Sequence, residues 1–138
     1  MDHKTATLVR QRAAHRCEYC QVAEEQDPFL SFHIEHVVAR KHGGTDDPEN
    51  LALACHQDNL HKGTDLTGID PRTGKVTRLF HPRRHRWNLH FRWRGHIIEG
   101  STAIGRTTVV VLAMNAPDRL GLREALVEAN EFPPTVPR

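Results

Sequence analysis

The sequence lacks any apolar run long enough to cross a membrane. No segment approaches the roughly 18 consecutive apolar residues that a membrane helix needs, and the first residues, MDHKTATLVRQR, contain no apolar stretch like that of a secretory signal. We therefore expect a cytoplasmic protein without a membrane partner. An internal repeat and a convincing linker are also missing, and 138 residues suit one folding unit, so we predict a single domain over residues 1–138.

Cysteine is scarce, and the chain contains only Cys17, Cys20 and Cys55. An odd number of cysteines in a sequence of this kind argues against a disulfide framework and favours metal ligands or free thiols. Hydrophobic residues make up 38% of the chain, a content that argues against wholesale disorder.

The formal net charge of +2 conceals an uneven distribution along the chain. Residues 1–74 contain 8 Lys and Arg against 12 Asp and Glu, whereas residues 75–106 contain 8 against 1. A basic band of this kind suits a polyanionic substrate. Clustered arginines are also common on an ordinary solvated face, so the band alone does not establish nucleic-acid binding.

The hydrophobic pattern predicts a mixed α+β protein. In the N-terminal half we expect a helix over residues 5–15 capped by Thr5, strands over 32–39 and 51–55, and a short helix that begins near Asp58. In the C-terminal half we expect a strand over 75–80, an exposed basic loop over 81–86, a β-hairpin of 87–94 and 96–99 around Gly95, and two helices, 102–114 (capped by Ser101 or Thr102) and 117–129.

The Cys-x-x-Cys of Cys17 and Cys20 is typical of a zinc knuckle, because such a turn points both thiolates inward. Cys55 is a plausible third ligand of a structural Zn²⁺, and the sequence after it offers two candidates for the fourth. Asp58 could bind through its carboxylate, or His56 could bind in its place. Alternatively the site is vestigial, the cysteines are buried free thiols, and Asp58 is the N-cap of the next helix.

A second group of polar residues has the chemistry of a hydrolytic metal site. Glu35 and His36 are adjacent in the predicted strand, so their side chains point to opposite faces and can serve different ligands. A carboxylate suits a hard divalent cation, and a neutral imidazole suits proton abstraction near neutral pH. Asn59 begins the next helix and can reach the same cation, and Asn50 lies where an amide can orient a histidine or its backbone.

These residues occur in a recognisable order: Cys-x-x-Cys, Glu-His, Gly-Gly, Asn-Leu and Cys-x-x-x-Asn-x-x-Lys-Gly. Over about residues 15–64 this order resembles the HNH endonuclease family, whose core is a ββα-metal fold of two strands and a helix around one divalent ion. The resemblance implies such a core at residues 15–64, followed by a basic β/α extension at about 65–132. The extension, with DPxTG, HPRR and FRW, is similar to that of small bacterial stand-alone HNH proteins.

The resemblance also implies roles for individual residues. His36 would be the general base that activates water, Asn50 would orient His36, and Glu35 and Asn59 would bind a catalytic divalent cation, Mg²⁺ or Mn²⁺. Lys62 would contact phosphate, although a solvated surface lysine is an equal alternative. The sequence departs from the family pattern at Glu35 (usually Asp), at Ala39 (commonly Pro) and at Asp58 (usually Cys), and the last of these puts the zinc site in doubt.

The basic band supplies further candidate contacts to nucleic acid: Arg83, Arg84, Arg86, Arg92 and Arg94. Strand alternation would place Phe91 and Trp93 on the face opposite Arg92 and Arg94, which favours a core role for the two aromatic residues. Nothing resembles a major-groove recognition helix. The sequence thus favours a divalent-metal-dependent endonuclease that acts on DNA. RNA is left open as an alternative substrate, and a homodimer as an alternative to a monomer. The alternative is a catalytically inactive zinc-knuckle module that binds nucleic acid.

Overall fold

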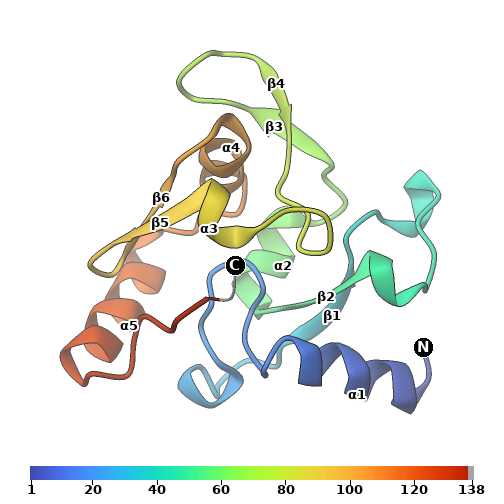
Figure 1. The fold of residues 1–138 in the computed structure, drawn as a ribbon, viewed down its shortest axis with the longest axis horizontal. Helices are drawn as coiled ribbons and strands as arrows, with labels where there is room; N and C mark the ends of the chain where they lie inside the picture. The colour runs from blue at the N-terminus through green and yellow to red at the C-terminus, as the bar shows by residue number, and fades with distance from the viewer. Residues whose placement is uncertain (137–138) are drawn as a thin grey trace. The chain divides into compact units, whose positions relative to one another are not determined.

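The computed structural model describes residues 1–136, and the chain divides into two compact units, Met1–Leu66 and Thr67–Arg138 (Figure 1). Each unit combines helices with short antiparallel strand pairs, so the predicted α+β class is confirmed. Within the described residues, no helix has the length and apolar character that a membrane span requires. The single domain over 1–138 stays a prediction, and each unit is described by itself.

The first unit is built around a two-stranded antiparallel pair followed by a short helix. Strand β1 (His33–His36) pairs with β2 (Leu51–Ala54), with His33 opposite Ala54 and His36 opposite Leu51. All four residues of β2 are buried, which explains its Leu-Ala-Leu-Ala sequence. The other elements are α1 (His3–Arg12), α2 (His56–Lys62) and the single-turn 3₁₀ helices η1 (Glu24–Gln26), η2 (Arg40–His42) and η3 (Pro48–Asn50).

Several predicted boundaries in this unit are wrong, among them the end of helix α1, which lies at Arg12 and not at residue 15. Helix α1 starts at His3 because the side chain of Asp2, not Thr5, caps it by accepting a hydrogen bond from the backbone N–H of Thr5. Strand β1 ends at His36, where the chain leaves the pair and turns into η2. Helix α2 starts at His56, two residues before Asp58, because the thiol of Cys55 takes the N-cap position.

The second unit contains two separate strand pairs and three helices. Strand β3 (Thr67–Ile69) pairs with β4 (Val76–Arg78), and β5 (Phe91–Arg94) pairs with β6 (Ile97–Gly100). The helices are α3 (Trp87–His90), α4 (Ala103–Val111), which Thr102 caps as one of the two predicted candidates, and α5 (Pro117–Glu128). The predicted β-hairpin and both C-terminal helices are therefore present.

The predicted hairpin is shorter than expected, because residues 87–90 form helix α3 and not the start of the strand. This turn of helix places Trp87 against Trp93, with 4.7 Å between the ring centroids, and Phe132 makes an edge contact with Trp93 at a centroid distance of 5.1 Å. Phe91 is also buried. Phe91 is thus a core residue, as strand alternation predicted, whereas Trp93 is only half-buried, and the ring contacts of both hold the hairpin in the unit.

Candidate active site and metal-binding cluster

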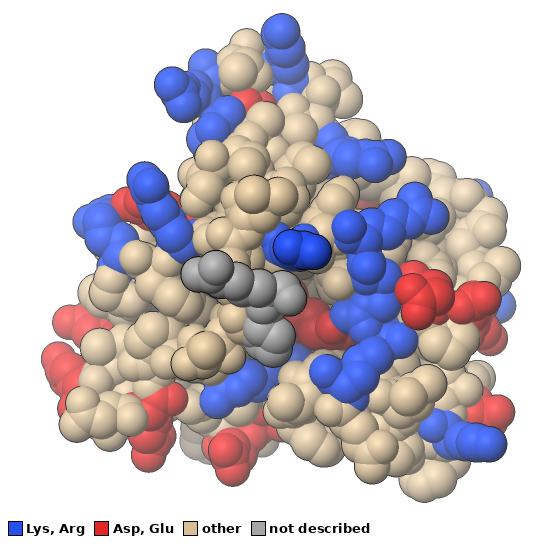
Figure 2. Space-filling model, in the orientation of Figure 1, with Lys and Arg blue, Asp and Glu red and all other residues tan. Residues whose placement is uncertain are grey.

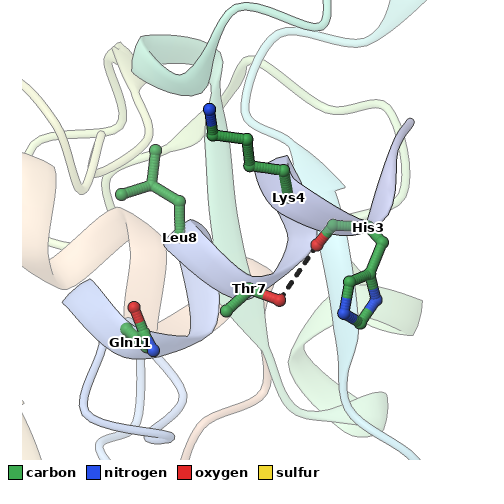
Figure 3. A pocket seen from close by; sticks show the side chains of 5 residues that line it. All are labelled: His3, Lys4, Thr7, Leu8 and Gln11. Carbon is green, nitrogen blue, oxygen red and sulfur yellow. Dashed lines mark hydrogen bonds between the residues drawn. The ribbon is translucent and has the colours of Figure 1, made fainter.

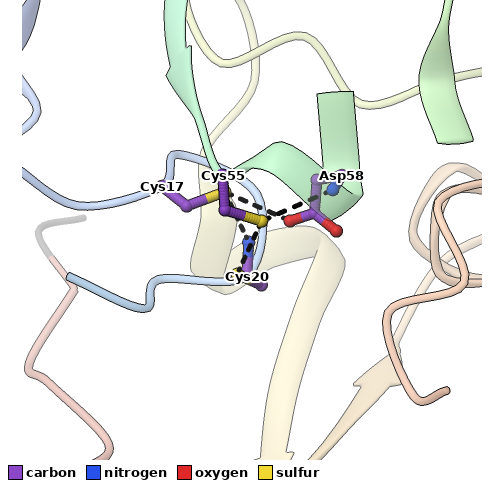
Figure 4. Close-up of side chains that lie close together, drawn as sticks. All are labelled: Cys17, Cys20, Cys55 and Asp58. Carbon is purple, nitrogen blue, oxygen red and sulfur yellow. Dashed lines mark hydrogen bonds between the residues drawn. The ribbon is translucent and has the colours of Figure 1, made fainter. Parts of the chain in front are cut away.

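The three cysteines and Asp58 form one buried cluster (Figure 4). Their four candidate ligand atoms all lie within 4.8 Å of one another, and no cysteine is in a disulfide. Cys17 and Cys20 come from a tight turn whose Cys17 N–H donates to the carbonyl of Val22, and Cys55 and Asp58 come from the start of α2. The structure therefore brings together the knuckle and the helix that the sequence singled out.

The dimensions and chemistry of this cluster fit a tetrahedral metal ion. Two thiolates bound to zinc at ~2.3 Å in a tetrahedron lie about 3.8 Å apart, and the sulfurs of Cys20 and Cys55 are separated by 3.8 Å. Burial raises the pKa of the Cys17 thiol and the pKa of the Asp58 carboxyl well above their ordinary values. Four buried donors with little other neutralising charge favour a bound cation, because the cation stabilises their deprotonated forms.

Asp58, not His56, lies with the cysteines. The Cys17 thiol donates to Asp58 Oδ2 at 3.1 Å, whereas His56 Nδ1 lies 3.2 Å from Nε2 of His33. The alternative in which Asp58 is the N-cap of α2 is wrong, because Asp58 lies inside the helix and its backbone N–H points to Cys55 Sγ at 3.4 Å. The observed placement favours a Cys₃Asp ligand set.

The second group of predicted residues lines a separate surface hollow of about 430 Å³ in the first unit. Glu35 and His36 reach it from β1, and Asn59 reaches it from α2. The hollow is also lined by His33, Ile34, Ala39, Arg40, Lys41, Gly63 and Thr64. The β1–β2–α2 order thus places the predicted general base and both predicted metal ligands around one space.

Glu35 is the buried wall of this hollow. Its Oε1 accepts a hydrogen bond from the hydroxyl of Tyr19, and its Oε2 lies 3.5 Å from the ammonium of Lys62. Burial raises the pKa of Glu35, and Lys62 and Tyr19 partly oppose this effect by stabilising the carboxylate. Tyr19 stands between Cys17 and Cys20 in sequence, so the cysteine turn also positions this carboxylate.

Lys62 does not lie where the resemblance implied. Its side chain is 1% exposed, and its ammonium donates to the carbonyl of Val37 at 2.9 Å besides pairing with Glu35. The solvated-lysine alternative is wrong, and the observed placement does not support a phosphate contact. This placement makes Lys62 the buried counter-ion of Glu35 and not a candidate phosphate contact.

Replacing Lys62 with methionine is expected to destabilise the protein by on the order of 3 kcal/mol, because it leaves the Glu35 carboxyl buried without its counter-ion. The free energy of unfolding in urea would measure the effect. Lys41→Met, at an exposed lysine of the same hollow, is the control and should change stability by less than about 0.5 kcal/mol. Equal stability of both variants would contradict the assigned role of Lys62.

His36 is held at the mouth of the hollow by an acidic residue that the sequence analysis did not single out. Its Nε2 lies 2.7 Å from Oδ1 of Asp46, and the same oxygen accepts a hydrogen bond from Arg40 at 2.6 Å. These hydrogen bonds, from His36 first and Arg40 second, lower the pKa of Asp46, so Asp46 is an anion near neutral pH. The contact fixes the orientation of the imidazole ring.

Asn50 acts on the backbone beyond His36 and not on the imidazole ring. Its amide nitrogen donates to the carbonyls of Val38 and Thr45 at 3.0 and 2.9 Å, and its Oδ1 accepts from the N–H of Val38 at 2.9 Å. Gly44 packs so closely under this clamp that a Cβ there would lie 1.7 Å from the Val38 carbonyl oxygen. Asn50 therefore shapes the loop that carries Asp46 to His36.

The predicted arginine contacts differ in their surroundings. Arg92 and Arg94 are exposed, but the Nε of each donates to the carboxylate of Glu99 on the neighbouring strand. Arg84 and Arg86 are exposed and Arg83 is half-buried. On the face drawn in Figure 2, blue Lys and Arg side chains in several places lie against red Asp and Glu side chains. Neighbouring acidic side chains therefore balance part of the exposed basic charge on this face.

Another hollow, on the surface of α1, carries no comparable chemistry. It is lined by side chains of one helix: His3, Lys4, Thr7, Leu8 and Gln11 (Figure 3). The Thr7 hydroxyl donates to the carbonyl of His3 at 2.9 Å and so is used within the helix. No residue predicted to be functional lies there.

Two residues of the site went unrecognised in the sequence analysis. Tyr19 is the buried partner of Glu35, and its position inside a Cys-x-x-Cys turn is a signal that could have identified it as buried. Asp46 lies 10 positions from His36, in a loop rich in turn-forming residues, where a carboxylate ordinarily caps or turns the backbone. No local sequence signal distinguishes its contact with His36 from that ordinary role.

Comparison with known proteins agrees with this geometry. The family model described as HNH endonuclease matches residues 17–65, a segment that contains the cysteine cluster, β1, β2, α2 and every residue predicted to act in catalysis. Neither the curated proteins nor the solved structures include a significant match to the chain. Residues 17–65 are therefore similar to an HNH endonuclease domain.

Proposed function

We propose that this protein is a divalent-metal-dependent endonuclease that hydrolyses phosphodiester bonds in DNA by a single-metal mechanism. One observation supports it above the others: Glu35, His36 and Asn59 line one hollow in a segment that matches the HNH family. A base, a carboxylate and an amide oxygen around one open space are the groups that hydrolysis of a phosphodiester needs. In this proposal β1, β2 and α2, which present these groups, would form the ββα-metal core that the resemblance implies.

The residues fit a bound Mg²⁺ or Mn²⁺. Glu35 Oε2 is buried and has no hydrogen-bond partner within residues 1–136, and Asn59 lines the same hollow. Hard cations prefer oxygen donors of these types. A cation held by Glu35 and Asn59 would supply Lewis-acid stabilisation of the charge that develops on the phosphate and on the leaving oxygen.

In this proposal His36 accepts the proton of the attacking water. Asp46 holds the ring by its Nε2 edge, and Asn50 holds the loop that positions Asp46. In-line attack on phosphorus with departure of the 3′ oxygen would leave 5′-phosphate and 3′-hydroxyl ends. The cysteine cluster with Asp58 would bind Zn²⁺ and serve the fold, since all four of its donors are buried away from the hollow that Glu35 and His36 line.

Substitution of Asp46 tests its role as the positioning residue of His36. We expect Asp46→Ala to lower kcat roughly tenfold with little change in KM, because the base loses its orientation and not its contact with substrate. Asp46→Asn keeps an oxygen acceptor and should recover part of the loss. Asp47→Ala, at the neighbouring exposed carboxylate, is the control. An unchanged kcat in Asp46→Ala would rule out the positioning role.

The substrate would be held through its backbone by Arg83, Arg84 and Arg86, with smaller contributions from Arg92 and Arg94 because Glu99 already pairs with both. Duplex DNA is the proposed substrate, and cleavage of RNA is tested alongside it. Assembly as a homodimer stays a prediction.

A second candidate function is a zinc-knuckle module that binds nucleic acid without cleaving it. The burial of Glu35 between Tyr19 and Lys62 favours it, since this carboxylate already has partners. The two candidates differ in their products. A 5′-labelled DNA duplex incubated with protein and Mg²⁺ or Mn²⁺ should yield fragments with 3′-hydroxyl ends that a polymerase extends. Binding of the duplex without any cleavage would favour the module.

A further inference from the structure

Strands β3 and β4 form a two-stranded ribbon whose inner face rests on α4. Gly68, at the centre of β3, lies so close to the helix that a Cβ there would lie 2.5 Å from Val111 Cγ2 and 3.0 Å from Thr107 Cγ2. Opposite Gly68 on β4 is Thr77, which is also partly covered. The close approach of backbone to helix leaves the ribbon only one free face.

The outer face of the ribbon is open to solvent. It carries Ile69 opposite Val76 and Thr67 opposite Arg78 in the antiparallel register. Ile69 is 54% exposed and Val76 is 71% exposed. An exposed aliphatic pair on a ribbon of three-residue strands contributes little to the core of the unit, so this face is suited to a contact outside the unit.

Every exposed charge of the ribbon and its turn is positive. Arg72 and Lys75 lie in the turn, Arg78 lies on the outer face, all three are exposed, and none forms an ion pair within the described residues. The only acidic residue of the segment 67–78 is Asp70, which is fully buried and accepts hydrogen bonds from Nε and Nη2 of Arg106 at 3.0 and 2.9 Å. Its negative charge is therefore neutralised beneath the surface.

Asp70 also makes the turn rigid. Its carboxylate accepts hydrogen bonds from the backbone N–H of Arg72 and from the hydroxyl of Thr73, both at 3.0 Å, and its backbone N–H donates to the carbonyl of Lys75 at 2.9 Å. The two turn cations consequently project from a backbone that is already ordered. A preorganised arrangement of cations loses little conformational entropy on binding a polyanion.

We propose that the outer face of the β3–β4 ribbon binds the backbone of duplex nucleic acid. Arg72, Lys75 and Arg78 would contact phosphates, and Ile69 and Val76 would contact sugars or base edges in a groove, which a two-stranded ribbon is narrow enough to enter. The sequence analysis assigned binding to other arginines and predicted β4 without its partner β3. This inference rests on the proposed function, because that function makes nucleic acid the partner.

Charge favours nucleic acid over a protein partner on this face. The contrast lies in the second strand pair of the same unit, where Glu99 of β6 balances Arg92 and Arg94 of β5. The ribbon has no such carboxylate on its exposed face. Three unpaired cations around an aliphatic pair complement alternating phosphates and sugars, whereas the core of a protein interface is depleted of charge.

The test is salt-dependent binding of a fluorescent DNA duplex, measured by anisotropy with full-length protein that carries His36→Ala so that the duplex stays intact. Adding Arg72→Ala and Arg78→Ala should make the negative slope of log K, the association constant, against log salt shallower by about 1.8. Each phosphate contact contributes roughly 0.9 to this slope. The same loss of slope should lower the affinity at 0.1 M salt by roughly 60-fold. Arg72→Lys with Arg78→Lys should restore the slope.

A second pair of variants tests the aliphatic contact. Ile69→Ser with Val76→Ser should weaken binding without changing the salt slope. Arg92→Ala with Arg94→Ala is the matched control and should change the slope by less than half as much as the ribbon pair, because Glu99 is already their counter-ion. All sites are exposed, and thermal unfolding of each variant confirms that the fold is retained.

An unchanged slope in the Arg72→Ala, Arg78→Ala protein would overturn the proposal. So would a shift from dimer to monomer in the ribbon variants with DNA binding retained, since the face would then join two copies of the chain. If the wild-type protein binds DNA through the ribbon but cleaves no DNA, the proposed function alone is refuted. Cleavage by the wild type with binding insensitive to the ribbon would refute this inference alone.

Discussion

Alanine in place of His36 should lower the single-turnover rate of DNA cleavage by roughly 10²–10⁴-fold, the contribution that a positioned general base ordinarily makes. The loss should be large because His36 is the only imidazole of the hollow that the structure pairs with a carboxylate, Asp46. Rates would be measured with a labelled duplex and protein in excess, so that product release does not limit them. DNA affinity should change little, because the imidazole acts on water and not on the bound backbone.

His42→Ala is the matched control for this substitution. His42 lies in η2, shortly after β1, is exposed and does not line the hollow. Its replacement should leave the rate within about twofold of the wild type, since exposed substitutions away from a site have small effects. A His36→Ala protein that folds normally and keeps the wild-type rate would show that another group is the base. His33 would then be the first candidate, because it lines the same hollow.

If the cysteine cluster binds zinc as proposed, removal of that ion is expected to have the largest effect on stability. The purified protein should contain one zinc per chain, and chelation should destabilise the first unit by several kcal/mol, because structural zinc sites contribute on the order of 10 kcal/mol in small domains. Without an ion, three thiols and the carboxyl of Asp58 would remain buried within 4.8 Å of one another. Elemental analysis and thermal unfolding with and without a zinc chelator would measure the two effects.

Two substitutions in α2 separate the candidate ligands. Asp58→Ala should lose zinc and stability, whereas His56→Ala should retain both, because Asp58 contacts Cys17 and His56 contacts His33. The reverse outcome would identify His56 as the fourth ligand. Full occupancy in both variants would mean that three cysteines suffice, and absence of zinc from the wild type would mean that the cluster is held by hydrogen bonds between protonated groups.

The residues that could be predicted are those whose spacing determines their position. A Cys-x-x-Cys turn places its two sulfurs together, and the step from Cys55 to Asp58 spans the first turn of a helix, so the cluster follows from local geometry. Antiparallel pairing of two short strands then brings Glu35 near α2 and Asn59.

The contacts that could not be predicted depend on tertiary burial. Lys62 ends a two-turn helix, where a lysine is ordinarily solvated, and only the packing of α2 against β1 encloses it with Glu35. Asp46 reaches His36 through a loop whose path depends on Asn50. Strand β3 was not predicted because its sequence, Thr-Gly-Ile, is short and contains a glycine. Glycine is unfavourable in strands unless another backbone or a helix approaches closely. Helix α4 makes such an approach at Gly68.

The most direct test of the central claim is the nicking of supercoiled plasmid by purified wild-type protein with Mg²⁺, with Mn²⁺ and without added divalent cation, beside His36→Ala. We expect conversion of supercoiled to open-circular or linear DNA only with a divalent cation, and none by His36→Ala in the same time. Plasmid that stays intact with either cation, in a preparation that binds DNA in a salt-sensitive manner, would contradict the assignment of a nuclease.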